Sequence, residues 1–176
     1  MYTTDRNGLT GWTDGAIALI DKKKQPNEPS WFSRKDGTAV MVFRDDNRSN
    51  KFYVACSEDY GRSWTKPAMS GFEDCKSKHR DGNLPDGTCY IISNPSVEFD
   101  RNPLTISLSK DGRHFDKAFV LKNESQWLAN DGRQLKGTYE YPSAVAWKDH
   151  FYVIYSAYKR DIGVSRFTLA DLVAAE

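Results

Sequence analysis

The 176-residue chain has little cysteine, and its three cysteines form no recognisable metal or disulfide pattern. Cys56, Cys75 and Cys89 lack the paired spacing of a zinc site, and an odd number does not suit a complete set of bridges. Cys56 and Cys89 lie in apolar stretches, which favours a role as small buried hydrophobic residues. The sequence therefore implies no metal and no other cofactor.

The chain also lacks an excess of charge of one sign and a long hydrophobic run. It has 25 basic and 24 acidic residues without a basic stripe, so nucleic acid is not an expected partner. No apolar stretch approaches the ~20 residues of a membrane span. Residues 1–8 are polar and do not look like a secretory signal. The length suffices for one domain with a substantial core, or for three to four propeller blades.

A turn-forming pattern is the clearest feature that is present. Residues 57–64 read SEDYGRSW, in which Ser and Asp side chains can bond the nearby backbone and Gly permits a positive φ. Residues 109–115, SKDGRHF, repeat it with Gly one position early and Phe in place of Trp. Residues 3–12, TTDRNGLTGW, are a looser copy. The copies start 54 and 52 residues apart, and a period of about 50 residues is typical of four-stranded propeller blades.

Short runs rich in β-branched and aromatic residues, bounded by Gly, Asp and Asn, predict strands along most of the chain. We expect them at 16–20, 38–44, 51–56, 88–93, 104–109, 117–121, 143–147, 150–156 and 161–167. A further short strand is expected to begin at Trp64. The strand at 38–44 is expected to be buried on both faces. Only residues 169–176 have helical character. This layout predicts an all-β meander of antiparallel sheets.

The period divides the chain into parts of a single propeller domain. We expect the end of one blade at 1–24, blades at 25–70 and 71–125, and an incomplete blade at 126–176. The chain begins inside a turn pattern and ends after the third strand of its last unit. A closed propeller usually pairs its two chain ends within one blade, which covers the strand edges. The units predicted here would leave edges and faces open, so the sequence predicts about half a propeller. Its open faces would need a second half-propeller, from another chain or an identical copy.

Three charged residues are placed where they could meet at one end of the central channel. Glu28 is expected just before the first strand of its blade, and Arg44 ends the second strand sixteen positions later. Such a pair is either a structural ion pair or part of a site. Arg101 comes just before the strand at 104–109, where it either pairs with Asp100 or helps Arg44 to bind an anion. Guanidinium groups match carboxylates bidentately.

The segment GTYEYPSAV at 137–145 adds two tyrosines. In an extended strand, Tyr139 and Tyr141 would share one face and Glu140 would take the other. Aromatic packing at the start of a blade is the commoner fate of tyrosine, and a site role is the alternative.

Together these patterns resemble the sialidase superfamily. Ser-x-Asp-x-Gly-x-x-Trp is the Asp-box of sialidases and their BNR-repeat relatives, and residues 57–64 fit it at all four positions. Glu28, Arg44, the Ser-Asn-Pro at 93–95 before Arg101, and the Tyr-Pro-Ser at 141–143 are similar in order and spacing to the second half of a bacterial exo-sialidase. The resemblance covers roughly residues 3–172 and implies about half of a six-bladed propeller.

The resemblance also implies residue roles. Tyr141 would be the nucleophile, with Tyr139 as the alternative, and Glu28 the base that takes its proton. Arg44 and Arg101 would bind the carboxylate of a sialic acid. Because the anomeric carbon of that sugar bears a carboxylate, a phenol approaches it with less charge repulsion than an Asp or Glu nucleophile. A phenol has an ordinary pKa of about 10 and needs the base. The expected activity is a retaining exo-α-sialidase-like hydrolysis of sialylated glycans.

The sequence departs from that family in ways that matter. It has no match to the Arg-Ile-Pro-like motif or to the Asp that acts as general acid and base, and the RNP at 101–103 falls in a later blade. The chain alone is therefore expected to be inactive or nearly so. A non-catalytic BNR-repeat segment that binds glycans or a partner is one alternative, and a propeller hydrolase for another sugar is the other. Trp31 and Trp127 are candidate pocket walls or packing residues. The resemblance implies a secreted or periplasmic parent protein.

Overall fold

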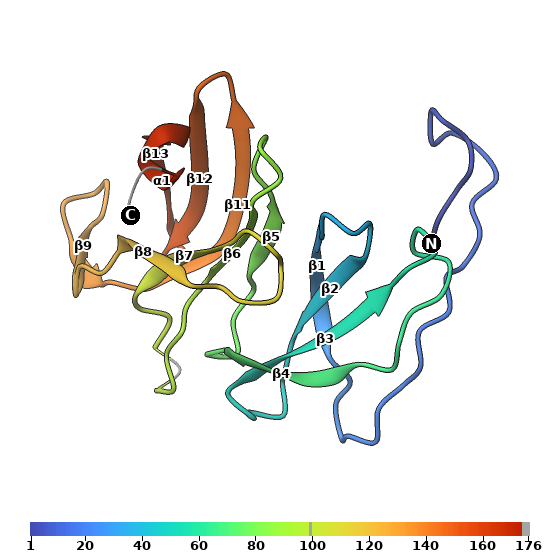
Figure 1. The fold of residues 1–176 in the computed structure, drawn as a ribbon. Coiled ribbons are helices and arrows are strands. Elements are labelled where there is room, and N and C mark those ends of the chain that lie inside the picture. Colours follow the sequence, from blue (N-terminus) through green and yellow to red (C-terminus); the bar gives the residue numbers. More distant parts are fainter. Residues whose placement is uncertain (99, 174–176) are drawn as a thin grey trace.

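The computed structural model describes residues 1–98 and 100–173, which form three antiparallel sheets of three or four strands, arranged side by side (Figure 1), and one small two-stranded sheet. The first sheet contains β1 (Asn27–Ser33), β2 (Ala39–Arg44), β3 (Lys51–Ser57) and β4 (Ala68–Glu73), in that order. The second contains β5 (Arg80–Asn83), β6 (Cys89–Ser93), β7 (Leu104–Ser109) and β8 (Lys117–Lys122). The third contains β11 (Tyr139–Trp147), β12 (His150–Ala157) and β13 (Asp161–Thr168). The predicted all-β meander of antiparallel sheets is confirmed.

Two small elements flank the third sheet. The hairpin of β9 (Gln126–Leu128) and β10 (Gln134–Lys136) precedes it, and the helix α1 (Leu169–Val173) follows β13. Within the described residues, no helix is long and apolar enough to span a bilayer. The last three residues of the predicted helical segment, 174–176, lie outside the described residues.

The first two sheets repeat each other at a spacing of fifty residues. Ser33 pairs with Ala39 in the first sheet, and Asn83 pairs with Cys89 in the second. The loop between each pair ends in an Asp-Gly-Thr sequence. Its glycine, Gly37 or Gly87, has φ = +87°, a backbone conformation that side chains disfavour. The two hairpins therefore share their geometry, at nearly the period of the turn pattern in the sequence.

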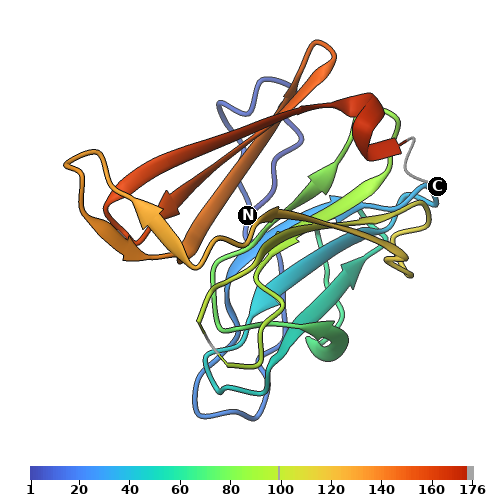
Figure 2. The same cartoon turned by 90° about the vertical axis from the view of Figure 1, so that its left-hand side faces the viewer.

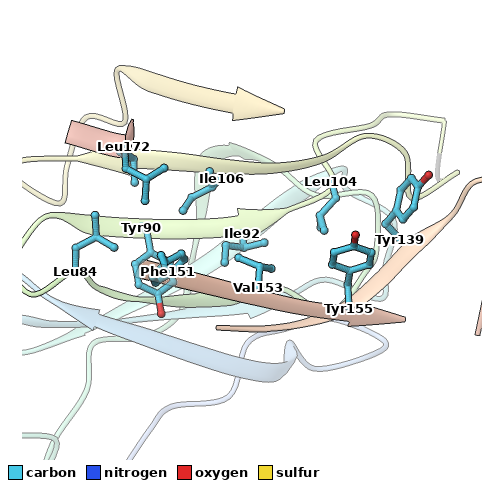
Figure 3. Close-up of a cluster of buried hydrophobic side chains, with 11 residues drawn as sticks. Leu84, Tyr90, Ile92, Leu104, Ile106, Tyr139, Phe151, Val153, Tyr155 and Leu172 are labelled. Atoms are coloured by element: carbon cyan, nitrogen blue, oxygen red, sulfur yellow. The ribbon is translucent and has the colours of Figure 1, made fainter. Parts of the chain in front are cut away.

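Each sheet packs one face against the next sheet. Strand alternation sends Val40 and Val42 of β2 toward Ile91 of β6, and sends Tyr90 and Ile92 of β6 toward the third sheet. The larger cluster, between the second and third sheets, is drawn in Figure 3. A third cluster, on the other face of the first sheet, is formed by Ile20, Phe43, Tyr53 and Ala55.

The first strands of the three sheets lie next to one another. β1 contacts β5, and β5 contacts β11, so these three strands form the common inner edge of the arrangement seen in the two views (Figure 1, Figure 2). Residues at the start of these strands therefore come together at one end of that inner edge. Glu28 and Tyr141 both lie there.

The 57–64 turn has the hydrogen bonds that its sequence predicts. The Ser57 hydroxyl accepts the Gly61 N–H at 2.8 Å, and Asp59 accepts the Ser63 hydroxyl at 2.6 Å. The indole of Trp64 donates to the Gly61 carbonyl at 3.0 Å. In the 3–12 turn the Trp12 indole donates to the Gly8 carbonyl, also at 3.0 Å. The looser first copy thus keeps the closing bond of the second.

Several strand predictions were wrong. Among the described residues, 16–20 form only an isolated bridge between Ala16 and Ser63. Trp64 opens no strand, and β4 starts four residues later. The expectation that β2 is buried on both faces is confirmed, with Val40 and Val42 buried on one face and Phe43 on the other. β5, β9 and β10 were missed, and β11 starts four residues earlier than expected.

Candidate functional site

Glu28 lies inside β1 and not before it. The pairing of β1 with β2 shifts register between Asn27 and Ser30, so Glu28 and Pro29 form a bulge. Glu28 has φ = +46°, whereas a residue before proline usually stays extended. The bulge directs this carboxylate toward Arg44.

Arg44 ends β2, as the sequence predicts, and is held between two carboxylates. Its Nη1 donates to Glu28 Oε2 at 2.6 Å, and its Nε lies 2.9 Å from Asp46 Oδ1. The second contact is an ion pair whose geometry is not that of a hydrogen bond, which leaves both atoms without a hydrogen-bond partner among the described residues. Burial opposes the charge of Arg44, but the hydrogen bond and the charges of Glu28 and Asp46 outweigh it and raise its pKa.

Asp46 completes this group, and the sequence analysis missed it. Burial disfavours its charge, but the Asn27 amide, which donates to Oδ2 at 2.9 Å, and the charge of Arg44 prevail and lower its pKa. The only sequence signal was the Asp-Asp pair that directly follows Arg44.

Lys78 is a second residue that the sequence did not reveal. It lies fifty positions after Glu28 and two residues before β5, and its ammonium group donates to the Glu28 carbonyl oxygen at 3.2 Å. Burial lowers its pKa, partly offset by the negative charge of Glu28. Lys78 therefore joins the first strands of the first two sheets at the end where Glu28 lies.

Tyr139 and Tyr141 do not share a face, contrary to the sequence prediction. β11 shifts register between Glu140 and Ser143, and Tyr141, which also precedes a proline, has φ = +51°. Tyr139 is fully buried, and its hydroxyl donates to Glu124 at 3.1 Å. Burial raises its pKa well above the ordinary value. Tyr141 is 45% exposed, so it is the tyrosine of the two that a ligand can reach.

Arg101 links the loop before β7 to the start of β11. Its guanidinium donates to Glu140, which is buried, and its Cζ lies 5.9 Å from the centroid of the Tyr141 ring. Its backbone also has a positive φ, at +56°. No ion pair joins it to Asp100 in the part of the chain that the structure describes. The alternative that paired these two residues is therefore wrong.

The buried Asn94 side chain holds the Arg101 loop in place through hydrogen bonds to its backbone. This side chain is 1% exposed, and its amide nitrogen donates to the carbonyl oxygens of Arg101, Pro103 and Tyr139 at 2.9–3.0 Å. Its amide oxygen accepts the Ser77 hydroxyl at 2.6 Å. One buried amide thus ties the Arg101 loop to the start of β11, and only its place in the Ser-Asn-Pro sequence hinted at this role.

Arg44 and Arg101 line the same cavity of about 230 Å³, together with Arg48, Cys75 and Lys76. Four of its five lining residues are cationic, which favours an anionic ligand. Burial raises the pKa of Cys75 to about 11, so this thiol stays neutral. A larger cavity of about 550 Å³, between the first two sheets, is apolar and contains none of the candidate residues.

Tyr141 lies beside the cavity, because Arg101, which lines it, has its Cζ 5.9 Å from the centroid of the Tyr141 ring. No hydrogen bond joins Tyr141 to Glu28 among the residues described, since the Glu28 carboxylate is engaged by Arg44. Neither tryptophan lines this cavity. Trp127 donates its indole N–H to Asp161 at 2.9 Å, and Trp31 lies beside Tyr60 and Trp64 at another cavity. The structure thus brings four predicted residues together, with Tyr139 as a packing residue nearby.

In residues 1–98 and 100–173, no cluster of three or more His, Cys, Asp or Glu side chains is suited to a metal ion.

Comparison with known families identifies the type of fold. The profile of the BNR repeat-like domain family matches residues 1–153. The chain belongs to this family. That membership places it in the sialidase-like BNR propeller superfamily that the sequence resembles. No curated protein sequence matches the chain.

Solved structures with the same fold include a Dyadobacter fermentans protein of unknown function, with 21% identity and a TM-score of 0.62. This chain matches it over 88% of its own length and 40% of the other. A Streptococcus pneumoniae sialidase is 18% identical with a TM-score of 0.63, over 88% of this chain and 23% of that one. A Penicillium chrysogenum α-L-arabinanase is 14% identical with a TM-score of 0.54, over 80% and 45%.

The chain therefore spans less than half the length of these three proteins. At such identities the likeness shows the fold alone, and it confirms a partial six-bladed propeller of the sialidase type. The chain therefore has the fold of part of a BNR-type propeller.

Proposed function

We propose that this segment carries part of the active site of a retaining hydrolase that acts on terminal sialic acids of glycans. In this proposal Tyr141 is the nucleophile, Glu28 takes its proton, and Arg44 and Arg101 bind the sugar carboxylate. The observation that carries the proposal is the cationic cavity lined by both arginines, with the exposed Tyr141 phenol beside it.

The proposed chemistry follows from these positions. A carboxylate entering the cavity would compete with Glu28 for Arg44 and with Glu140 for Arg101. Release of Glu28 from Arg44 would free its oxygen to accept the phenolic proton, which makes substrate binding and base activation parts of one event. The phenolate would then attack the anomeric carbon as the leaving group departs. A developing negative charge on the phenol is favoured by the nearby guanidinium groups.

The sequence has no match to the Asp that acts as general acid and base in sialidases, or to the arginine of their first blade. The test should therefore not depend on an acid catalyst. A 3-fluorosialosyl fluoride carries its own leaving group: the phenolate forms a bond to the anomeric carbon, fluoride leaves, and the proton passes to Glu28. Mass spectrometry of the 176-residue chain should locate the sugar on Tyr141. Tyr141→Phe should abolish this label and Glu28→Gln should slow it, whereas labelling elsewhere, or none, would contradict the catalytic assignment.

Binding provides a separate test. Isothermal titration with N-acetylneuraminic acid should show binding that Arg44→Lys and Arg101→Lys each weaken at least about tenfold, because lysine cannot hold a carboxylate bidentately. The methyl ester of the same sugar is the matched control and should bind no better than a neutral sugar. Equal binding of galactose or arabinose would favour a propeller hydrolase for another sugar.

A non-catalytic glycan-binding or scaffold segment is the second candidate. It is favoured by the way each guanidinium already meets a carboxylate of the same chain, Arg44 with Glu28 and Arg101 with Glu140. Such satisfied pairs are also what a purely structural site would contain. If the chain binds sialic acid but Tyr141 takes no covalent label, the result favours a non-catalytic glycan-binding segment. If it neither binds sialic acid nor takes the label, the result favours a scaffold.

A further inference from the structure

The first two sheets leave between them a cavity of about 550 Å³, a size usual for small-molecule sites. It lies between β2, β3 and β4 of the first sheet and β6, β7 and β8 of the second. Val42, Phe52 and Ile91 in its interior are 1–2% exposed, whereas Gly71 and Ala118 at its mouth are exposed. All of its lining residues lie in the range 32–118, so the two four-stranded sheets form it and neither end of the sequence takes part.

Small side chains on one face of the second sheet explain this cavity. The residues that pair in a row across β6, β7 and β8 and line the cavity are Ile91, Ser107 and Ala118. The neighbouring row, which packs in the filled interface with the third sheet, is Ile92, Ile106 and Phe119. Figure 3 shows Ile92 and Ile106 in that interface. The same three strands thus fill one interface and leave room in the other.

Phenylalanine rings line much of the cavity. Phe115 stands where the 57–64 turn has Trp, and its ring is smaller than an indole. It meets Phe32 and Phe72 edge to face, with ring centroids 5.7 and 4.7 Å away. Phe52 lines the cavity as well. An aromatic ring placed among these side chains gains edge-to-face contacts that a saturated group of the same size lacks.

A cation at one end of the cavity indicates the charge of a ligand. Arg34, in the loop between β1 and β2, lines the cavity beside Gly112, and its Nε donates to the Gly112 carbonyl oxygen at 3.1 Å. Arg34 is partly buried, and no carboxylate within the described residues forms an ion pair with it. Arg113, which also lines the cavity, is paired with Asp36 at 3.2 Å. The guanidinium left to bind a carboxylate is therefore that of Arg34.

The other end of the cavity has no such unpaired charge. Lys51 begins β3, beside the end of β2 where Arg44 lies, whereas Arg34 lies beyond the opposite end of β2. The Lys51 ammonium lies 4.0 Å from the Glu73 carboxylate, and both residues line the cavity. The charges at this end balance each other. A ligand with one negative group therefore has one favoured direction in the cavity.

We propose that this cavity binds an aromatic carboxylate. Its ring lies among Phe32, Phe72 and Phe115, and its carboxylate lies on the Arg34 guanidinium. The apolar walls supply most of the contact, and the single cation fixes the orientation of the ligand. This inference does not depend on the proposed hydrolase activity, because the cavity contains none of the residues assigned to that reaction.

Titration of the 176-residue chain with 4-phenylbutanoate, followed in methyl NMR spectra, tests the site. The acid should shift the signals of Val42, Val54 and Ile91, with a Kd of about 1 mM or lower. The neutral analogue 4-phenylbutan-1-ol should bind at least about fivefold more weakly. Three results would overturn the proposal: no shifts at about 10 mM acid, shifts confined to exposed residues of the third sheet such as Ile154 and Ile162, or equal binding of acid and alcohol.

A saturated analogue tests the preference for a ring. In 4-cyclohexylbutanoate the carbon skeleton and the carboxylate are unchanged, but the ring is not aromatic. It should bind at least about threefold more weakly than 4-phenylbutanoate, because the edge-to-face contacts are lost. Equal binding of the two acids would contradict the aromatic assignment.

Substitution of Arg34 tests the position of the carboxylate. Arg34→Met should remove the preference for the acid over the alcohol and leave the Kd of the alcohol unchanged. The matched control Arg113→Met should keep that preference, since Asp36 already engages Arg113. Comparing two ligands on each variant separates loss of the charge from damage to the cavity, which would weaken both. Retention of the preference in Arg34→Met would overturn the assignment.

Filling the cavity tests its location. Ala118→Phe places a ring at the mouth and should weaken both ligands at least about tenfold by steric exclusion. Ile162→Phe is the control, because it adds a ring at an exposed position of β13, away from the cavity. Equal effects of the two substitutions, or unchanged binding in Ala118→Phe, would show that the ligand binds elsewhere.

Discussion

The guanidinium of Arg101 lies over the ring of Tyr141, with Cζ 5.9 Å from the ring centroid, while it also donates to Glu140. Glu140 and Tyr141 are adjacent in the chain, so one arginine contacts both the buried and the exposed residue of the β11 bulge. A cation placed over an aromatic face is attracted to it. This relationship orients the exposed phenol, which no hydrogen bond within the described residues holds.

The two tyrosines at the start of β11 should respond differently to loss of the hydroxyl. Tyr139→Phe removes a buried hydroxyl bonded to Glu124, and should lower the free energy of unfolding by about 1–2 kcal/mol. Tyr141→Phe should change it by less than about 0.5 kcal/mol. Urea unfolding followed by tryptophan fluorescence measures both, and equal losses would contradict the assignment of Tyr139 to packing and Tyr141 to the site.

Arg44 should be needed for stability as well as for the cavity. Its side chain is 13% exposed, so Arg44→Met leaves Glu28 and Asp46 without their shared cation and should cost about 2–3 kcal/mol of unfolding free energy. The double variant Arg44→Met with Glu28→Gln should recover part of that loss, because one uncompensated charge is removed. A double-mutant cycle measures this coupling, and strictly additive losses would show that the Glu28 contact contributes nothing.

Replacing Asn94 by its closest isostere, aspartate, should strongly lower the free energy of unfolding. Asn94→Asp replaces the amide nitrogen, which donates to three carbonyl oxygens, with an oxygen that repels them. The expected loss is more than about 3 kcal/mol. Thr105→Ser, a conservative change in the adjacent strand, is the control for general sensitivity of this region. Wild-type stability in the Asp variant would mean that Asn94 does not anchor the Arg101 loop.

The 57–64 turn should make stability depend on acidity. Hydrogen bonds from Ser63 and Ser57 lower the pKa of Asp59 to about 2, below the ordinary value of about 3.9. The stabilisation is present in full above the unfolded-state pKa, and it is lost as the pH falls through about 4 toward 2. Asp59→Asn should flatten the fall of the urea midpoint over this range. Glu58→Gln controls for net charge, and an equal flattening by both would reject the turn as the cause.

The sequence was most informative where a residue's side chain bonds its own backbone. The turn at 57–64 depends on contacts within eight residues, so local chemistry determines it. β5 was missed for the opposite reason: its sequence, Arg-Asp-Gly-Asn, has no apolar alternation, and its buried Asp81 is paired with His79. Residues 16–20 have strand composition, but a strand also needs a neighbour, and composition does not reveal whether one is present.

The sequence indicated some members of the site but missed Asp46 and Lys78, and it did not predict the geometry. The order and types of Glu28, Arg44 and Arg101 indicated a common location, and the structure brings them together. The sequence could not distinguish Tyr141 from Tyr139, because simple alternation ignores the bulge. The prolines at 29 and 142 lie in both bulges, but a residue before proline is usually extended, so the sequence does not predict the positive φ of Glu28 and Tyr141.

The paired bulges have a consequence for how this protein could change over time. After Pro29 and Pro142, β1 and β11 pair regularly with β2 and β12, and their buried side chains pack against neighbouring sheets. Glu28 and Tyr141, directly before those prolines, lie in the bulges and have no partner residue in this pairing. Substitutions that improve or relax packing between sheets can therefore accumulate without moving the two residues. New chemistry could likewise arise at these two positions while the architecture stays the same.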